Sequence, residues 1–239
     1  MYRSVPALLL LVFREVFPPY VLSMSHGDTG ETVCCELTIC CPVRHKGGGS
    51  MITVTPCMRF SKTYVSGAIV IDPILREDDR GHFCRTWCAQ EFRENGIDFS
   101  PVQSNTGFNI RRGTVRGMHL QLAPALEAKL IMCSQGSLFD VVLDMRPDSA
   151  SYLKWSYVEL TSSNRRMLYI PEGCAHGYQT LEDNTAIMYL SSQYYAPSAA
   201  RGVRFDDPSF GIQWPLTATA ISEQDRHWPL MKEEGGLPW

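Results

Sequence analysis

Two histidines close short glycine-containing segments, and their residue type and spacing make them the first candidates for chemistry. His119 ends residues 113–119 with the spacing G-x5-H, and His176 ends residues 171–176 with the spacing P-x-G-x-x-H. Imidazole has the unperturbed side-chain pKa closest to neutrality, so both rings are suited to proton transfer near pH 7. Lys129, ten residues after His119, is a candidate donor to a developing enolate oxygen. The plainer alternatives are buried histidines that only complete a hydrogen bond, and a lysine that lies in solvent.

The same two spacings also resemble the paired motifs of metal-binding cupins, in which the sequence H-x-H places two imidazoles on one face of a strand. In this chain the second position of that pair is Gln121. Even with Glu127 as a further ligand, two histidines and one carboxylate would make a weak metal centre. We therefore expect no metal and no other cofactor, and a metal-dependent cupin enzyme remains the alternative.

Proton abstraction beside a ketone also requires a carboxylate that fixes the imidazole tautomer, a donor for the enolate oxygen and a second acid on the opposite face. The elements that must bring such groups together are predicted to be strands. From Met58 onward, short β-branched and aromatic runs alternate with Gly, Pro, Asp and Asn, a pattern typical of all-β domains. The candidate strands are residues 68–74, 116–122, 128–135, 137–144, 155–161, 167–170, 177–181 and 186–192.

The spacing of these strands predicts a mainly β fold, a cupin-type jelly-roll β-barrel rather than a parallel βαβ sheet. Two short helices are expected at its periphery, at residues 89–95 and 222–227. Ser222 is a candidate N-cap for the second helix, and Asp225 lies in its first turn. The helices are too short to form a layer of their own, so the chemistry is expected inside the β-structure.

The chain of 239 residues is interpreted as one domain with an N-terminal extension. Residues 1–50 end in the sequence GGGS and are expected to be an unstructured leader or upstream extension. The functional protein is then expected to begin near Met51 or Met58, and residues 58–239 to form the cupin-type domain.

Charge and cysteine usage exclude several classes of protein. The net charge of -3 argues against a broad surface for nucleic acid or for an anionic membrane. The apolar residues 8–17 are interrupted by Arg14 and Glu15 and are too short to span a bilayer. The nine cysteines follow neither a C-x-x-C zinc spacing nor an even disulfide framework. We expect a cytoplasmic, thiol-containing protein that binds neither nucleic acid nor membrane.

Several ordered sequence blocks together resemble the dTDP-4-dehydrorhamnose 3,5-epimerase family, over residues 58–230. They include QSN at 103–105, RGMHLQ at 116–121, AKL at 128–130, IPEGCAHG at 170–177, RGVRFDDP at 201–208, GIQWPL at 211–216 and SEQD at 222–225. The resemblance implies a homodimeric jelly-roll enzyme without a cofactor. It also implies that the substrate is a nucleotide-linked, dTDP-type 4-keto-6-deoxyhexose, epimerised at C3 or C5 or at both carbons.

The resemblance also implies a role for each matching residue. His119 takes the position of the catalytic base, Asp225 that of its paired carboxylate and Tyr189 that of the proton donor. Lys129 is implied as a further catalytic residue at the ketone, where His176 contacts the substrate. The residues implied in binding the nucleotide portion are Arg80, Arg116, Gln103 and Asn105.

Three positions depart from the family pattern. Arg85 and Ala200 stand where acidic residues are usual, and Gln224 stands where a lysine is common. These positions belong to the binding shell, so they bear on which sugar or nucleotide is bound. They also keep open a second function, a non-catalytic cupin that binds a sugar nucleotide without exchanging its protons.

Overall fold

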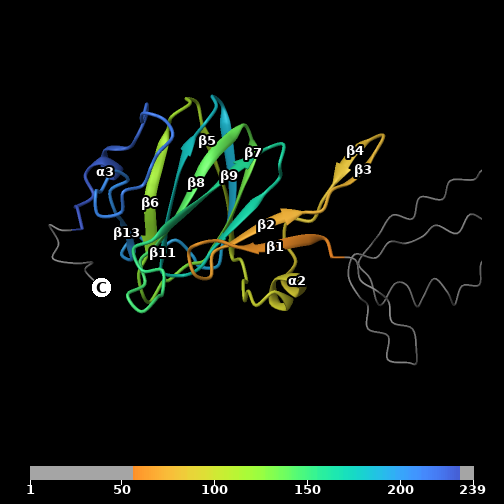
Figure 1. The fold of residues 1–239 in the computed structure, drawn as a ribbon, viewed down its shortest axis with the longest axis horizontal. Helices are drawn as coiled ribbons and strands as arrows, with labels where there is room; N and C mark the ends of the chain where they lie inside the picture. Colours follow the sequence, from red (N-terminus) through yellow and green to blue (C-terminus); the bar gives the residue numbers. More distant parts are fainter. Residues whose placement is uncertain (1–55, 232–239) are drawn as a thin grey trace, which may run out of the picture. The chain divides into compact units, whose positions relative to one another are not determined.

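The computed structural model of the chain describes residues 56–231, and the regular secondary structure of this part consists mainly of antiparallel strands (Figure 1). The first sheet has the strand order β1-β2-β10-β7-β12-β5. Its strands are β1 Met58–Lys62, β2 Ile69–Pro73, β10 Met167–Ile170, β7 Lys129–Gln135, β12 Thr185–Ser191 and β5 Gln103–Asn109. The second sheet has the order β13-β6-β11-β8-β9. Its strands are β13 Ala200–Gly202, β6 Val115–Gln121, β11 Cys174–Thr180, β8 Ser137–Asp144 and β9 Trp155–Thr161.

Four small elements lie outside the two large sheets. Strands β3 (Arg76–Asp78) and β4 (Gly81–Phe83) form a separate hairpin, which projects away from the sheets beyond the end of β2 (Figure 1). Helix α2 (Ala89–Glu94) lies near β1 and β2, and helix α3 (Glu223–Arg226) lies beside β6 at the other end of the structure (Figure 1). No helix among residues 56–231 is long and apolar enough to cross a membrane.

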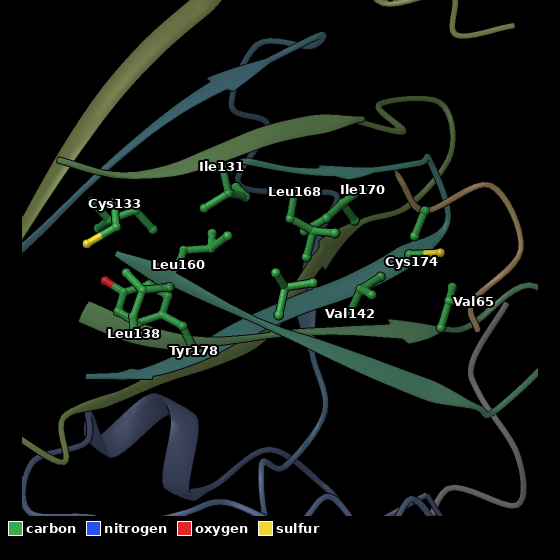
Figure 2. Close-up of a cluster of buried hydrophobic side chains, with 13 residues drawn as sticks. Val65, Ile131, Cys133, Leu138, Val142, Leu160, Leu168, Ile170, Cys174 and Tyr178 are labelled. Carbon is green, nitrogen blue, oxygen red and sulfur yellow. The ribbon is translucent and has the colours of Figure 1, made fainter. Parts of the chain in front are cut away.

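The main core fills the space between the two sheets. Ile131 of β7 and Leu168 of β10 extend from the first sheet toward Leu138 of β8 and Leu160 of β9 in the second (Figure 2). All four side chains are completely buried. Burying such side chains stabilises the fold by roughly 1.5–3 kcal/mol each, so this cluster fixes the two sheets against each other and holds the strands that carry polar residues.

The predicted β fold is confirmed, and several strand bounds are exact. Strands β8, β9 and β10 match the predicted residues 137–144, 155–161 and 167–170. The two sheets of the described part are not joined into one closed barrel, so the architecture is a jelly-roll-type sandwich. The expected leader, residues 1–50, and residues 232–239 of the expected domain lie outside the described residues.

Other bounds differ from the prediction for physical reasons. Strand β11 begins at Cys174, because the segment after Pro171 continues the ladder with β8 through Ala175 and His176. Strands β1 and β5 were not among the candidates. Strand β5 has the polar sequence QSNTGFN and lies at a sheet edge, where side chains meet solvent and the usual β-branched signal is weak.

Candidate active site

A cavity of about 240 Å³ lies between the two sheets, and polar side chains reach it from both. Strands β6 and β11 of the second sheet contribute His119 and His176, which are direct partners in the antiparallel ladder. Strands β7 and β12 of the first sheet contribute Lys129 and Tyr189. The other lining residues are Thr106, Gly107, Arg116, Tyr178 and Ile187.

His119 is joined to a buried carboxylate from the far end of the chain. Its Nε2 lies 2.6 Å from Oδ1 of Asp225, whose side chain is almost fully buried in helix α3. The helix is held by Ser222, whose hydroxyl accepts a hydrogen bond of 3.0 Å from the backbone N–H of Asp225. The prediction of Ser222 as N-cap is confirmed by this bond. With Nε2–H donated to the carboxylate, the lone pair of His119 Nδ1 is the one available to accept a proton.

The carboxylate of Asp225 has donors besides the imidazole. The backbone N–H of Gly117 donates to Oδ2 at 3.3 Å, and Trp228 Nε1 donates to Oδ1 at 3.3 Å. Burial by itself raises the pKa of Asp225, but the hydrogen bond and charge of His119 and the Gly117 N–H outweigh it and lower the pKa below its ordinary value. Asp225 is therefore ionised at neutral pH and fixes one tautomer of His119.

Gly117 allows strands β6 and β11 to approach closely at this point. Its φ of +120° is unfavourable for other residues. A Cβ atom here would lie 2.5 Å from the Cα of Gly177 and 2.7 Å from the carbonyl oxygen of His176. The ladder shifts register between His176 and Tyr178, beside this contact. Gly117 and Gly177 thus allow the two imidazole-bearing strands to come close together.

His176 has a carboxylate partner that the sequence analysis did not single out. Its Nε2 lies 2.6 Å from Oδ1 of Asp140, a fully buried residue of β8. Burial raises the pKa of Asp140, although the charge and hydrogen bond of His176 and the charge of Lys129 act in the opposite direction. The sequence does mark Asp140 in one way, because it is a carboxylate in the middle of the apolar sequence SLFDVVLD.

Lys129 is held in place by a nearby ion pair. Its Nζ lies 2.8 Å from Oε1 of Glu127, and both side chains are mostly buried. The hydroxyl of Ser191 donates to the other carboxylate oxygen of Glu127 at 2.9 Å. Glu127, which the sequence analysis considered only as a metal ligand, therefore positions the ammonium group that lines the cavity.

Tyr189 faces the cavity from the sheet opposite to His119. Burial raises the pKa of its hydroxyl, and the negative charge of Glu127 adds to this, while Arg116 acts in the opposite direction. The phenol therefore stays protonated at neutral pH. A protonated tyrosine is a hydrogen donor and, with a suitable base on the other sheet, a general acid.

The residues implied in nucleotide binding are placed differently. Arg116 lines the cavity, and its Nε donates to Asn109 Oδ1 at 2.8 Å. Asn105 is the ladder partner of Tyr189, so both side chains lie on one face of the sheet. Gln103 instead accepts a hydrogen bond of 2.7 Å from the backbone N–H of Tyr195. Arg80 lies on the β3–β4 hairpin, bonded to Asp78, and the structure does not bring it to the cavity of its own chain.

Gln121, at the position of a metal ligand in other cupins, has a structural role. Its amide nitrogen donates to the carbonyl oxygens of Ala125 and Tyr194, and its oxygen accepts from the backbone N–H of Ala196. These bonds fasten the segment after β12 to strand β6 and occupy both ends of the amide. Among residues 56–231, no group of three or more His, Cys, Asp and Glu side chains is arranged to hold a metal ion.

The three departures from the family pattern lie outside the lining of this cavity. Arg85 forms a part-buried ion pair of 2.9 Å with Glu91 of helix α2. Ala200 pairs with Gln121 in the β13–β6 ladder. Gln224 is exposed on helix α3, next to the buried Asp225. Each of these positions has a local structural setting, and none is among the residues that line the cavity.

Comparison with known proteins gives a consistent result. A family model described as dTDP-4-dehydrorhamnose 3,5-epimerase matches residues 62–233. The protein of that name from Methanothermobacter thermautotrophicus is 40% identical over 178 residues, which cover 73% of this chain and 95% of the relative. The crystal structure of the Bacillus anthracis enzyme, with TDP and PPi bound, has a TM-score of 0.70 and 36% identity, covering 72% of this chain and 99% of the other.

Two further structures extend this comparison. The Legionella pneumophila enzyme in complex with dTDP-4-keto-L-rhamnose has a TM-score of 0.67 and 31% identity, covering 70% of this chain and 89% of the other. A 3′-monoepimerase from Streptomyces bikiniensis in complex with dTDP-quinovose has a TM-score of 0.68 and 29% identity, covering 73% of this chain and 90% of the other. The chain belongs to the dTDP-4-dehydrorhamnose 3,5-epimerase family, a family of isomerases with this β fold.

Proposed function

We propose that this protein epimerises C3 and C5 of a dTDP-linked 4-keto-6-deoxyhexose by proton abstraction and reprotonation, without a cofactor. Family membership supports the reaction class, and the relatives crystallised with TDP and with dTDP-4-keto-L-rhamnose support the substrate class. The curated relatives that are 33–40% identical to this chain carry the name of a 3,5-epimerase, so we propose that both carbons react.

One observation carries the proposal: His119 and Tyr189 line one cavity from opposite sheets. Inversion at a carbon requires removal of the proton on one face of the sugar and delivery of a proton on the other. A flat 4-keto sugar between the two sheets would present one face to His119 and the other to Tyr189. The lowered pKa of Asp225 keeps a carboxylate beside His119, as a base requires. The raised pKa of Tyr189 keeps its hydroxyl protonated, as an acid requires.

The steps follow from these positions. Nδ1 of His119 takes the proton from the carbon next to the ketone, and the electron pair of the C–H bond moves into the enolate. The ammonium group of Lys129, held by Glu127, stabilises the negative charge that forms on the ketone oxygen. The Tyr189 hydroxyl then protonates the same carbon from the opposite face, which inverts it.

The nucleotide end of the substrate requires cations for its pyrophosphate, and we propose that Arg116 supplies one of them. A guanidinium group pairs with two phosphate oxygens at once. We further propose that the protein is a homodimer in which Arg80 serves the cavity of the partner. The β3–β4 hairpin projects away from the two large sheets (Figure 1). The side chains of Arg80 and Phe83 on this hairpin are largely exposed.

We also propose a cytoplasmic location, where sugar nucleotides and a reducing environment coexist. Cys84, Cys88, Cys133 and Cys174 are free thiols in the described structure, which suits a reducing compartment. The dimer is tested by sedimentation of the full chain, which is expected to give twice the monomer mass of 26.9 kDa. A monomer at micromolar concentration that is fully active would contradict the shared site.

The reaction is tested by incubating the protein with a dTDP-4-keto-6-deoxyhexose in D2O. Deuterium at C3 and C5, together with inverted product, is the expected result. Deuterium at one carbon alone would make the protein a monoepimerase. Tight binding without any exchange would instead favour the non-catalytic sugar-nucleotide-binding cupin.

A further inference from the structure

The cavity holds two Asp–His pairs of the same local geometry. In each pair the Nε2 atom of the histidine lies 2.6 Å from Oδ1 of the aspartate, in His119–Asp225 and in His176–Asp140. The two histidines are ladder partners on β6 and β11. Geometry alone would therefore give both pairs the same chemistry, and the difference between them lies in what surrounds each carboxylate.

The carboxylate of Asp225 is surrounded by donors. Besides His119 it accepts hydrogen bonds from the Gly117 N–H and from Trp228, and the His119 side chain is 45% exposed. A negative charge at this place is stabilised by these three donors. The pair therefore holds a single proton, on Nε2 of His119, and carries a net charge of about -1.

The carboxyl group of Asp140 lies in the opposite environment. Its side chain has no exposed surface, and its Oδ2 atom is buried without a hydrogen-bond partner among residues 56–231. An ionised carboxylate would leave that oxygen unpaired in the core, which costs free energy. The cation that acts on it from β7, Lys129, already has Glu127 as its counter-ion at 2.8 Å. The raised pKa of Asp140 agrees with a proton that stays on this pair.

We propose that the His176–Asp140 pair holds one more proton than the His119–Asp225 pair, so that His176 presents an N–H to the ketone oxygen while His119 presents a lone pair to the sugar carbon. One proton is on Nδ1 of His176, and the other is shared between Nε2 and Asp140. The pair is then neutral overall. This inference rests on the proposed epimerase function and assigns opposite proton-transfer roles to two pairs of matching geometry.

The proton balance of the step is closed. As His119 takes the carbon proton, the C=O electron pair moves to the oxygen, and the Nδ1 proton of His176 passes to that oxygen. The shared proton then moves fully onto Nε2 and a neutral enol forms. The charge of Lys129 stabilises first the negative charge that develops on the ketone oxygen and then the carboxylate that is left at Asp140. When Tyr189 protonates the carbon, the enol proton returns to His176 and the shared proton returns to Asp140. Solvent then returns a proton to the Tyr189 phenolate and takes the carbon proton from His119, which closes the cycle. Asp140 acts through His176 and is a positioning residue in this scheme.

The direct test is nitrogen NMR of the full chain labelled with 15N-histidine, at pH 7 and without substrate. The signals of the two rings are assigned by their loss in His119→Gln and His176→Gln. We expect Nδ1 of His176 to be protonated and Nδ1 of His119 to be unprotonated. An unprotonated Nδ1 on His176 would overturn the inference.

A kinetic test uses Asp140→Asn, which keeps the size of the side chain. The asparagine amide donates to Nε2 and keeps the proton on Nδ1, but it has no proton to release. We expect kcat to fall on the order of 10²-fold and KM to stay close to the wild-type value. An unchanged kcat would contradict the shared proton, whatever happens to the melting temperature.

The matched control is Asp144→Asn, at the other end of the same strand. Asp144 is equally buried but accepts hydrogen bonds from Arg146, Ser149 and Ser151 and does not line the cavity. Its substitution is expected to lower the melting temperature and to leave kcat and the histidine signals unchanged. Deuterium exchange by the wild type distinguishes the two claims. If the wild type exchanges no deuterium, the proposed epimerase function is wrong. If it exchanges deuterium but Nδ1 of His176 is unprotonated, only the inference about the His176–Asp140 pair is wrong.

Discussion

His119 Nε2 and Asp225 Oδ1 lie 2.6 Å apart although 106 positions separate them in the chain. Strand β6 supplies the imidazole and the four-residue helix α3 supplies the carboxylate. The helix begins after Ser222, whose hydroxyl caps it and turns Asp225 toward the strand. Helix α3 contacts strand β6, which lies between β13 and β11 in the second sheet.

The first prediction concerns Asp225→Asn. The amide removes the charge that fixes the His119 tautomer, so we expect kcat to fall on the order of 10⁴-fold, as when the equivalent carboxylate of a Ser-His-Asp triad is replaced. The measurement is steady-state epimerisation followed by NMR of the product. Asp206→Asn, which breaks an ion pair with Arg204 outside the cavity, is expected to keep wild-type kcat. A similar loss in both variants would contradict the specific role of Asp225.

Tyr189→Phe separates proton removal from inversion. The base on the opposite sheet is untouched, so exchange of the carbon proton with D2O is expected to continue, while formation of inverted product falls on the order of 10²-fold or more. Tyr157→Phe on the outer part of β9 serves as the control, since Tyr157 is exposed and does not line the cavity. Equal loss of exchange and of inversion in Tyr189→Phe would rule out its role as the opposite-face acid.

Lys129→Met tests the stabilisation of the enolate. The unbranched methionine fills the same space without charge, so we expect kcat to fall roughly 10²- to 10³-fold, the usual effect of losing one donor to a developing oxyanion. Lys154→Met changes an exposed lysine outside the cavity and is expected to leave kcat unchanged. An active Lys129→Met enzyme would remove Lys129 from the mechanism.

Arg80 offers a test of the dimer that depends on which chain supplies it. Arg80→Ala and His119→Ala are each expected to be poorly active, but co-expression of the two chains should restore activity. A mixed dimer then contains one cavity with both residues, so about a quarter of all cavities are intact if chains pair at random. No restoration in mixed dimers would mean that Arg80 serves its own chain or none.

Stability in acid is expected to depend on Asp144. Burial raises the pKa of this carboxyl, but hydrogen bonds from Arg146, Ser149 and Ser151 lower it from 3.8 to about 2. Because the folded pKa is below the unfolded one, the stabilisation is complete above about pH 4 and is lost as pH falls toward 2, and it amounts to about 2 kcal/mol. Urea unfolding between pH 5 and 2 measures it. Asp144→Asn should flatten that part of the profile, and an unchanged profile would contradict the assignment.

The fold and much of the cavity were predictable because their signals are local. The apolar sequence of β8 and the turn residues around it fixed a central strand, and the spacing of the two histidine segments indicated their shared site. Strand β5 was missed because its composition is polar. Asp140 was missed because its role depends on its contact with His176. The two residues are far apart in the sequence and come together only when β8 and β11 pair.

The placement of Arg80 shows a different limit. The sequence resemblance implied nucleotide binding, and the structure puts this residue on a hairpin away from the cavity of its own chain. In the proposed dimer Arg80 would reach the cavity of the partner, a contact that forms only between two chains. Gln103 likewise matched a binding position, and its side chain instead fixes the backbone at Tyr195.

The most direct test of the central claim is deuterium incorporation by wild-type protein and by His119→Ala. His119 is partly exposed and contributes little to the core, so the variant is expected to keep its melting temperature. In D2O with a dTDP-4-keto-6-deoxyhexose, the wild type is expected to incorporate deuterium at C3 and C5, and folded His119→Ala to incorporate none above the uncatalysed rate. Undiminished incorporation by folded His119→Ala would contradict the account.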